Sequence, residues 1–163
     1  MNVILKSILA VSLGVMSIGA MAHDDATLDT MSAPNGGQLR MVGAYHLELV
    51  LAKNNKIKES PISLYLTDHA GNKKAAQGAS ATATIMTGKN KAVVSLVPSA
   101  DNQLSGVGKY AYSPKTKVAV TIRFADNSQG QTVFTPATAN AKPSKQSHEA
   151  HQSEHDGHQH HHH

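Results

Sequence analysis

The feature that most constrains this chain is a set of short runs in which apolar and polar residues alternate. In the run 44–52, a tyrosine and three leucines occupy the odd positions, with His46, Glu48 and Val50 between them. The same period of two recurs at 61–67 and 115–124. A period of two places every second side chain on one face of a β-strand, whereas a helix repeats every ~3.6 residues. These runs therefore predict half-buried strands.

Clusters of Gly, Asn, Asp and Pro separate these runs and predict turns. Further candidate strands lie between the turns, at 38–42, 79–87, 91–97, 103–107 and 131–134. We expect 103–107 to be a short edge strand. Short strands with a turn about every ten residues are typical of antiparallel sandwiches and barrels. The sequence thus predicts an all-β fold, a single antiparallel β-sandwich or barrel of about seven or eight strands.

Residues 1–22 have the features of a secretory signal peptide. Lys6 provides a positive start, 8–20 is mostly apolar, and Ala20-Met21-Ala22 fits the small-residue cleavage pattern. An uncleaved membrane anchor is the alternative, but the apolar run is short for a bilayer span. We therefore expect cleavage after Ala22, no transmembrane anchor afterwards, and a location in the periplasm, with the outside of the cell as the alternative.

Several functional classes are disfavoured by composition. The chain has no cysteine, which rules out disulfides, thiolate metal sites and cysteine nucleophiles. Its net charge of +4 comes from scattered lysines without interleaved aromatic residues, so nucleic acid is not an expected partner. The motifs G-x-S-x-G and H-E-x-x-H and a phosphate-binding glycine loop are missing. We therefore do not expect an enzyme.

The C-terminal tail, 147–163, carries eight of the eleven histidines. They are His148, His151, His155, His158, His160, His161, His162 and His163. The tail has no large apolar side chain, so it is not expected to fold by itself. Neutral imidazole binds Cu, Zn, Ni and Co, and short His-rich tracts are typical metal binders. A purification tag is the alternative, although only four histidines are consecutive and Gln159 interrupts the run.

Cleavage after Ala22 would make His23 the first residue of the mature chain. Its α-amine and imidazole Nδ1 could then chelate one copper ion. The alternative is that His23 is simply the frayed start of an acidic lead. We expect five segments along the chain: a signal peptide at 1–22, a flexible lead at 23–33, a β-domain at 34–136, a linker at 137–146 and the tail at 147–163.

The β-domain offers few further metal ligands. His46 and Glu48 are two residues apart on one predicted strand, so they share a face with Cα atoms about 6.5–7 Å apart. They could hold one ion or pair as charges, or they could be part of a solvated strand face. His69 is expected to be an exposed turn residue. The methionines outside 1–22 do not form the cluster of a copper(I) shuttle.

The segment 34–51, P-N-G-G-Q-L-R-M-V-G-A-Y-H-L-E-L-V-L, resembles a small β-domain of heavy-metal efflux systems. The likeness continues through 64–72, 78–82 and 102–106. Such domains occur at the N-terminus of periplasmic adaptor subunits of metal-exporting pumps and as free-standing periplasmic proteins. The matching positions are Gly36, Gly37, Tyr45, His46, Glu48 and Asp68. Asn35 stands where the family usually has the His of H-G-G. If that His and the one matching His46 form a joint metal site in relatives, this chain has lost one ligand.

These features together predict a periplasmic protein that binds a divalent transition metal, Cu, Zn, Ni or Co. It would buffer the metal or deliver it to a heavy-metal efflux system, whose periplasmic subunits are the expected partners. The expected metal ligands are His23 and the eight histidines of the tail. The alternative is a protein-docking β-module of an envelope or efflux complex, in which the tail only solubilises.

Overall fold

The computed structural model describes residues 25–138, and the predicted signal peptide, His23 and the His-rich tail lie outside the described residues. The described part is all-β, as predicted, with one short helix. The elements are α1 (Asp25–Thr30), β1 (Gln38–Val42), β2 (Tyr45–Leu51), β3 (Lys58–Thr67), β4 (Ser80–Thr87), β5 (Asn90–Ala100), β6 (Gln103–Tyr110), β7 (Lys117–Arg123) and β8 (Gln129–Phe134).

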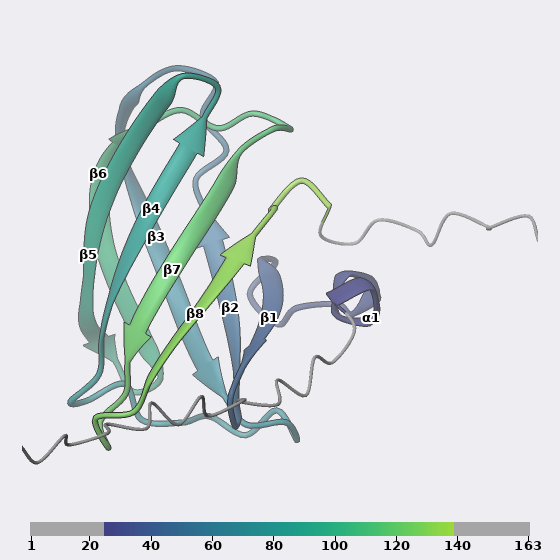
Figure 1. Ribbon diagram of the computed structural model, residues 1–163, viewed down its shortest axis with the longest axis vertical. Helices are drawn as coiled ribbons and strands as arrows, with labels where there is room; N and C mark the ends of the chain where they lie inside the picture. The colour runs from purple at the N-terminus through teal and green to yellow at the C-terminus, as the bar shows by residue number, and fades with distance from the viewer. Residues whose placement is uncertain (1–24, 139–163) are drawn as a thin grey trace, which may run out of the picture.

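All the strands pair antiparallel in one sheet that curls into a nearly closed barrel (Figure 1). The strand order is β1-β2-β3-β6-β5-β4-β7-β8. The curl depends on β5, which pairs with β4 over 90–96 and with β6 only over Val97–Ala100. An irregular register between Pro98 and Ala100 accompanies this change of partner. Such irregularities bend a strand and increase its twist.

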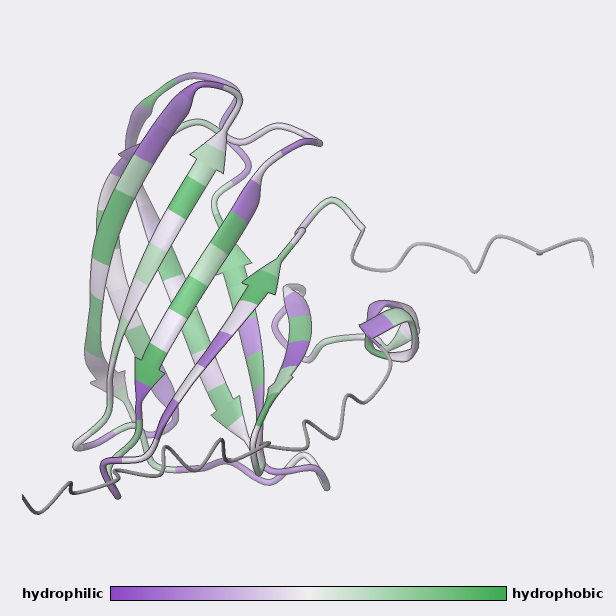
Figure 2. Ribbon diagram, in the orientation of Figure 1, coloured by the Kyte–Doolittle hydropathy of each residue, from purple (hydrophilic) through white to green (hydrophobic). Residues whose placement is uncertain are grey.

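The core is built from the alternating rows that the sequence predicts. The register places Leu47 opposite Leu66 and Leu49 opposite Leu64, and all four side chains are buried. Banding of apolar and polar residues along the strands is visible in Figure 2. The predicted row on β7 is also buried, from Val118 through Val120 to Ile122 and Phe124.

One strand departs from the prediction, because β6 is not at an edge. It is longer than 103–107 and lies between β3 and β5. The sequence prediction was wrong here because Gly106 and Gly108 weaken a strand pattern. In the structure these glycines allow β5 to pack closely against β6. A Cβ atom at Gly106 would collide with the Ser95 carbonyl, and one at Gly108 would collide with the Val94 side chain.

β1 and β8 are the two ends of the sheet, and side chains join them. Gln38 and Arg40 point to the inside of the barrel, since they lie opposite Leu49 and Leu47 in the register. The Gln38 amide oxygen accepts a hydrogen bond from the Thr135 backbone N–H at 2.7 Å. Arg40 Nε donates to the Val133 carbonyl at 3.2 Å. These polar side chains thus close the barrel along the β1–β8 seam.

The helix α1 lies beside β1 on the outside of the barrel (Figure 1). The sequence predicts a flexible lead at 23–33, which includes this helix. Six residues are too few to form a stable helix alone, so tertiary contacts must hold it. Leu28 is buried, and the Asp29 carboxylate accepts hydrogen bonds from Gln38 Nε2 at 2.6 Å and Arg40 Nη1 at 2.7 Å.

These bonds also set the ionisation of Asp29. Burial alone would raise the pKa of Asp29, but hydrogen bonds from Arg40 and Gln38 and the charge of Arg40 outweigh it and lower the pKa. Thr138 Oγ1 donates to the same carboxylate at 3.3 Å. The two ends of the described chain therefore meet at Asp29.

Candidate metal centre

The β1–β2 hairpin carries the first histidine of the barrel. Gly43 and Ala44 form its turn, and Gly43 has a φ of 59°. A two-residue hairpin turn with Gly as its first central residue is typical of type II′. Tyr45 stacks on Phe124 with ring centroids 4.1 Å apart, which fixes the start of β2. His46 consequently points to the outside, where it is half-buried.

The second histidine lies in the turn that follows β3, at the same end of the barrel (Figure 1). Asp68 organises this turn through hydrogen bonds from the Ala70 N–H at 3.0 Å and the Asn72 N–H at 2.9 Å. Its other oxygen accepts from the Asn72 side chain at 3.1 Å and pairs with Lys74 at 3.1 Å. The bonds from Asn72, followed by those of Lys74, hold the pKa of Asp68 well below its usual range. The carboxylate therefore stays ionised and holds the turn.

The hairpin and the turn bring His46 and His69 together. Their ring centroids are 4.9 Å apart and the ring planes differ by only 9°. His69 Nε2 lies 3.3 Å from the Gly43 carbonyl oxygen. A carbonyl only accepts hydrogen bonds, so Nε2 carries the hydrogen, and in the neutral ring the lone pair is on Nδ1. Metal-binding histidines commonly donate their other N–H to a backbone carbonyl in this way.

The pair can supply two nitrogen ligands to one transition-metal ion. Stacked rings hold their in-plane lone pairs in two nearly parallel planes, so at least one ring must rotate for both nitrogens to face one ion. Among residues 25–138, no three His, Asp or Glu side chains gather closely enough to hold an ion by themselves. A third ligand must therefore be of another kind or come from another part of the chain.

Glu48 does not extend the pair, although it shares a strand face with His46. Its side chain is buried at 3% exposure, so the solvated strand face considered from the sequence is wrong at this position. One carboxylate oxygen accepts from the Asn35 N–H at 2.8 Å and the Gly37 N–H at 2.9 Å. The other accepts from the Asn35 side chain at 2.8 Å. Glu48 thus anchors the turn before β1, and Asn35 serves as its hydrogen-bond donor.

The register could not be predicted from the sequence, and this is why the pair was missed. Thr67 lies opposite His46, and His69 follows two residues later. His69 is indeed an exposed turn residue, as predicted. The alternating runs 44–52 and 61–67 are the signal for two paired strands, but the loop between them leaves their alignment open. His23 and the eight tail histidines lie outside the described residues.

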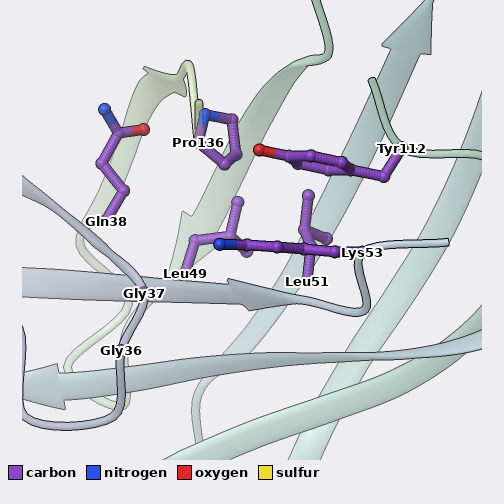
Figure 3. A pocket seen from close by; sticks show the side chains of 8 residues that line it. All are labelled: Gly36, Gly37, Gln38, Leu49, Leu51, Lys53, Tyr112 and Pro136. Carbon is purple, nitrogen blue, oxygen red and sulfur yellow. The ribbon is translucent and has the colours of Figure 1, made fainter. Parts of the chain in front are cut away.

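Three hollows of the described barrel lie away from the histidine pair. Figure 3 shows one at an open end, where Leu49 and Leu51 point from β2 toward Tyr112 and Pro136. Its volume is about 40 Å³, room for little more than water. Two others have volumes of about 190 and 350 Å³. The first is lined by Ile57 and Tyr110, and the second lies over β4 and β7. No histidine or carboxylate lines any of the three.

Comparisons with protein-family models, curated proteins and solved structures found no match for this chain. None of the helices within 25–138 is long and apolar enough to cross a membrane.

Proposed function

We propose that this chain is an exported, non-enzymatic protein that binds transition-metal ions through imidazole. The observation that carries the proposal is the stacking of His46 on His69, at 4.9 Å between ring centroids. Two histidines 23 positions apart in the chain come together because a hairpin and a carboxylate-anchored turn place them there. Paired imidazoles at a partly exposed surface are suited to capture of Cu, Zn, Ni or Co.

The sequence adds a second group of ligands to this proposal. Eight histidines at 147–163 offer many more nitrogen donors than the barrel does. A tail that needs no preformed site can load quickly and exchange its ions. The barrel pair is held by ordered backbone, so we propose that it retains a single ion.

Export and delivery complete the proposal. The signal-like segment 1–22 supports a periplasmic location, and the resemblance at 34–51 supports a role beside a heavy-metal efflux pump. The protein would buffer metal or pass it to a periplasmic subunit of such a pump. A donor must also release its ion, which suits a dissociation constant near 1 μM, or about −8 kcal/mol.

Equilibrium dialysis followed by metal analysis tests this function. The proteins compared are the full chain, a variant lacking 147–163, and the same truncation with His46→Ala and His69→Ala. Thr82→Ala, an exposed change on β4, is the matched control. We expect the truncation to remove most of the Zn or Ni and keep at most one equivalent. The two histidine changes should then remove that last equivalent.

Two other results would contradict the proposal. Binding that is unchanged by both the truncation and the histidine changes would place the metal elsewhere. A full chain that takes up no metal would remove the function entirely and favour the docking module instead.

A further inference from the structure

A thioether side chain lies next to the histidine pair. Met41 on β1 is the register partner of His46 on β2. Directly opposed residues of antiparallel strands share one face, with Cβ atoms about 4.5–5.5 Å apart. The Met41 thioether is therefore on the same outer face as the His46 ring, and both side chains are half-buried.

We infer that Met41, His46 and His69 form one site for a soft monovalent cation, Cu(I). This inference rests on the proposed function, because it requires the histidine pair to bind metal, and it narrows the choice of metal. Thioether sulfur selects Cu(I) among the biological transition metals, whereas zinc sites use imidazole, thiolate and carboxylate. The site contains no thiolate, because the chain has no cysteine.

The surrounding carboxylates are committed to other bonds, which leaves sulfur as the third donor. Glu48, two residues along β2, accepts three hydrogen bonds from Asn35 and Gly37. Asp68, next to His69, is held by Asn72 and Lys74. A hard divalent ion that prefers carboxylate oxygen would have to break one of these sets. A soft ion needs no such rearrangement.

The site combines a fixed backbone with adjustable side chains. The hairpin turn at Gly43 and the stacking of Tyr45 on Phe124 fix Met41 and His46 relative to each other. Methionine has a flexible, unbranched side chain, so its sulfur can move toward an ion without moving the strand. Rotation of the stacked rings brings their nitrogens toward the same point.

Methionine methyl NMR of the full chain, titrated with Ag(I) as a redox-stable substitute for Cu(I), tests the inference. We expect the Met41 methyl signal to shift as Ag(I) is added to saturation, while those of Met31 and Met86 stay in place. The shift should disappear in the His46→Ala, His69→Ala double variant. In anaerobic competition with a chromophoric Cu(I) chelator, Met41→Leu should lower the Cu(I) affinity of the barrel site about 100-fold. Even substitutions of residues that only support a ligand lower metal affinity about 10–100-fold. Met86→Leu is the matched control.

The outcomes separate this inference from the function on which it rests. If the imidazole signals of His46 and His69 respond to metal while the Met41 methyl signal does not, the Cu(I) site is overturned and the proposed function stands. Equal shifts of Met31, Met41 and Met86 would show indiscriminate thioether binding and also overturn it. If neither the imidazoles nor Met41 respond to Ag(I), Zn²⁺ or Ni²⁺, both proposals fail for the barrel.

Discussion

Replacing Asp29 by Ala should destabilise the barrel, because Asp29 is the main partner of a buried cation. The Arg40 side chain is only 4% exposed, and Asp29 lies 2.7 Å from its Nη1. Removing one partner of a buried pair costs about 3–5 kcal/mol. Two features of the structure reduce this figure. Asp29 is itself 20% exposed, and Asp25 lies 3.6 Å from Arg40 Nε and can partly replace it.

We therefore expect Asp29→Ala to lower the free energy of unfolding by about 2–3 kcal/mol. For a domain of this size, that corresponds to a fall in Tm of about 10 °C. Urea denaturation followed by circular dichroism measures the change, with Asp101→Ala, an exposed turn carboxylate, as the control. Equal stability of Asp29→Ala and the control, within about 0.5 kcal/mol, would refute the role of Asp29 at the seam.

The same variant gives a pH dependence of known sign. The pKa of Asp29 is lowered by folding from its unfolded value of 3.8. Its stabilising contribution is therefore present above pH 3.8 and is lost as the pH falls through the folded pKa. The stability difference between the wild-type protein and Asp29→Ala should be constant near neutrality and should shrink in acid. A difference that grows as the pH falls below 3.8 would contradict this assignment.

Three further predictions concern processing, metal-free folding and the seam. Protein from its native host should begin at His23. An intact mass that still includes Lys6 and the rest of 1–22 would contradict the export prediction. In excess chelator, circular dichroism should still report β-structure and a cooperative melt, because the buried rows supply a core without metal. Gly130→Ala should cost about 1–3 kcal/mol, since a Cβ there meets Val42 across the seam. The loss caused by Gly130→Ala in urea denaturation should be smaller in a Val42→Ala background, and an equal loss in both backgrounds would show that Val42 is not the obstacle.

The strands and the core were predictable because they depend on local patterns. The runs at 44–52 and 61–67 alternate strictly, and burying one face of each leaves little choice of which side chains point inward. The clusters of turn residues indicated where the strands lie, but β3, β5, β6 and β8 extend beyond the predicted runs. The glycine-containing strand β6 was misplaced at an edge because no local pattern shows which strands pack against its glycines.

The rest depends on contacts between segments far apart in the chain. The bond from the Thr135 N–H to Gln38 joins the two ends of the sheet, and no local pattern indicates it. The helix α1 is stabilised by the contact of Asp29 with Arg40 on β1. The histidine pair depends on the register between β2 and β3, which the sequence leaves open. The alternating pattern also does not reveal the roles of polar residues that point inward, such as Gln38 and Arg40.

The most direct test of metal binding by the barrel is a ¹H–¹⁵N NMR titration of the imidazole rings with Zn²⁺ at about pH 7.5. We predict that the ring nitrogens of His46 and His69 shift together, at the same stoichiometry, and return to their metal-free positions when excess chelator removes the metal. The result that would contradict metal binding at the pair is a titration in which only the histidines of 147–163 respond while His46 and His69 stay unchanged to saturation.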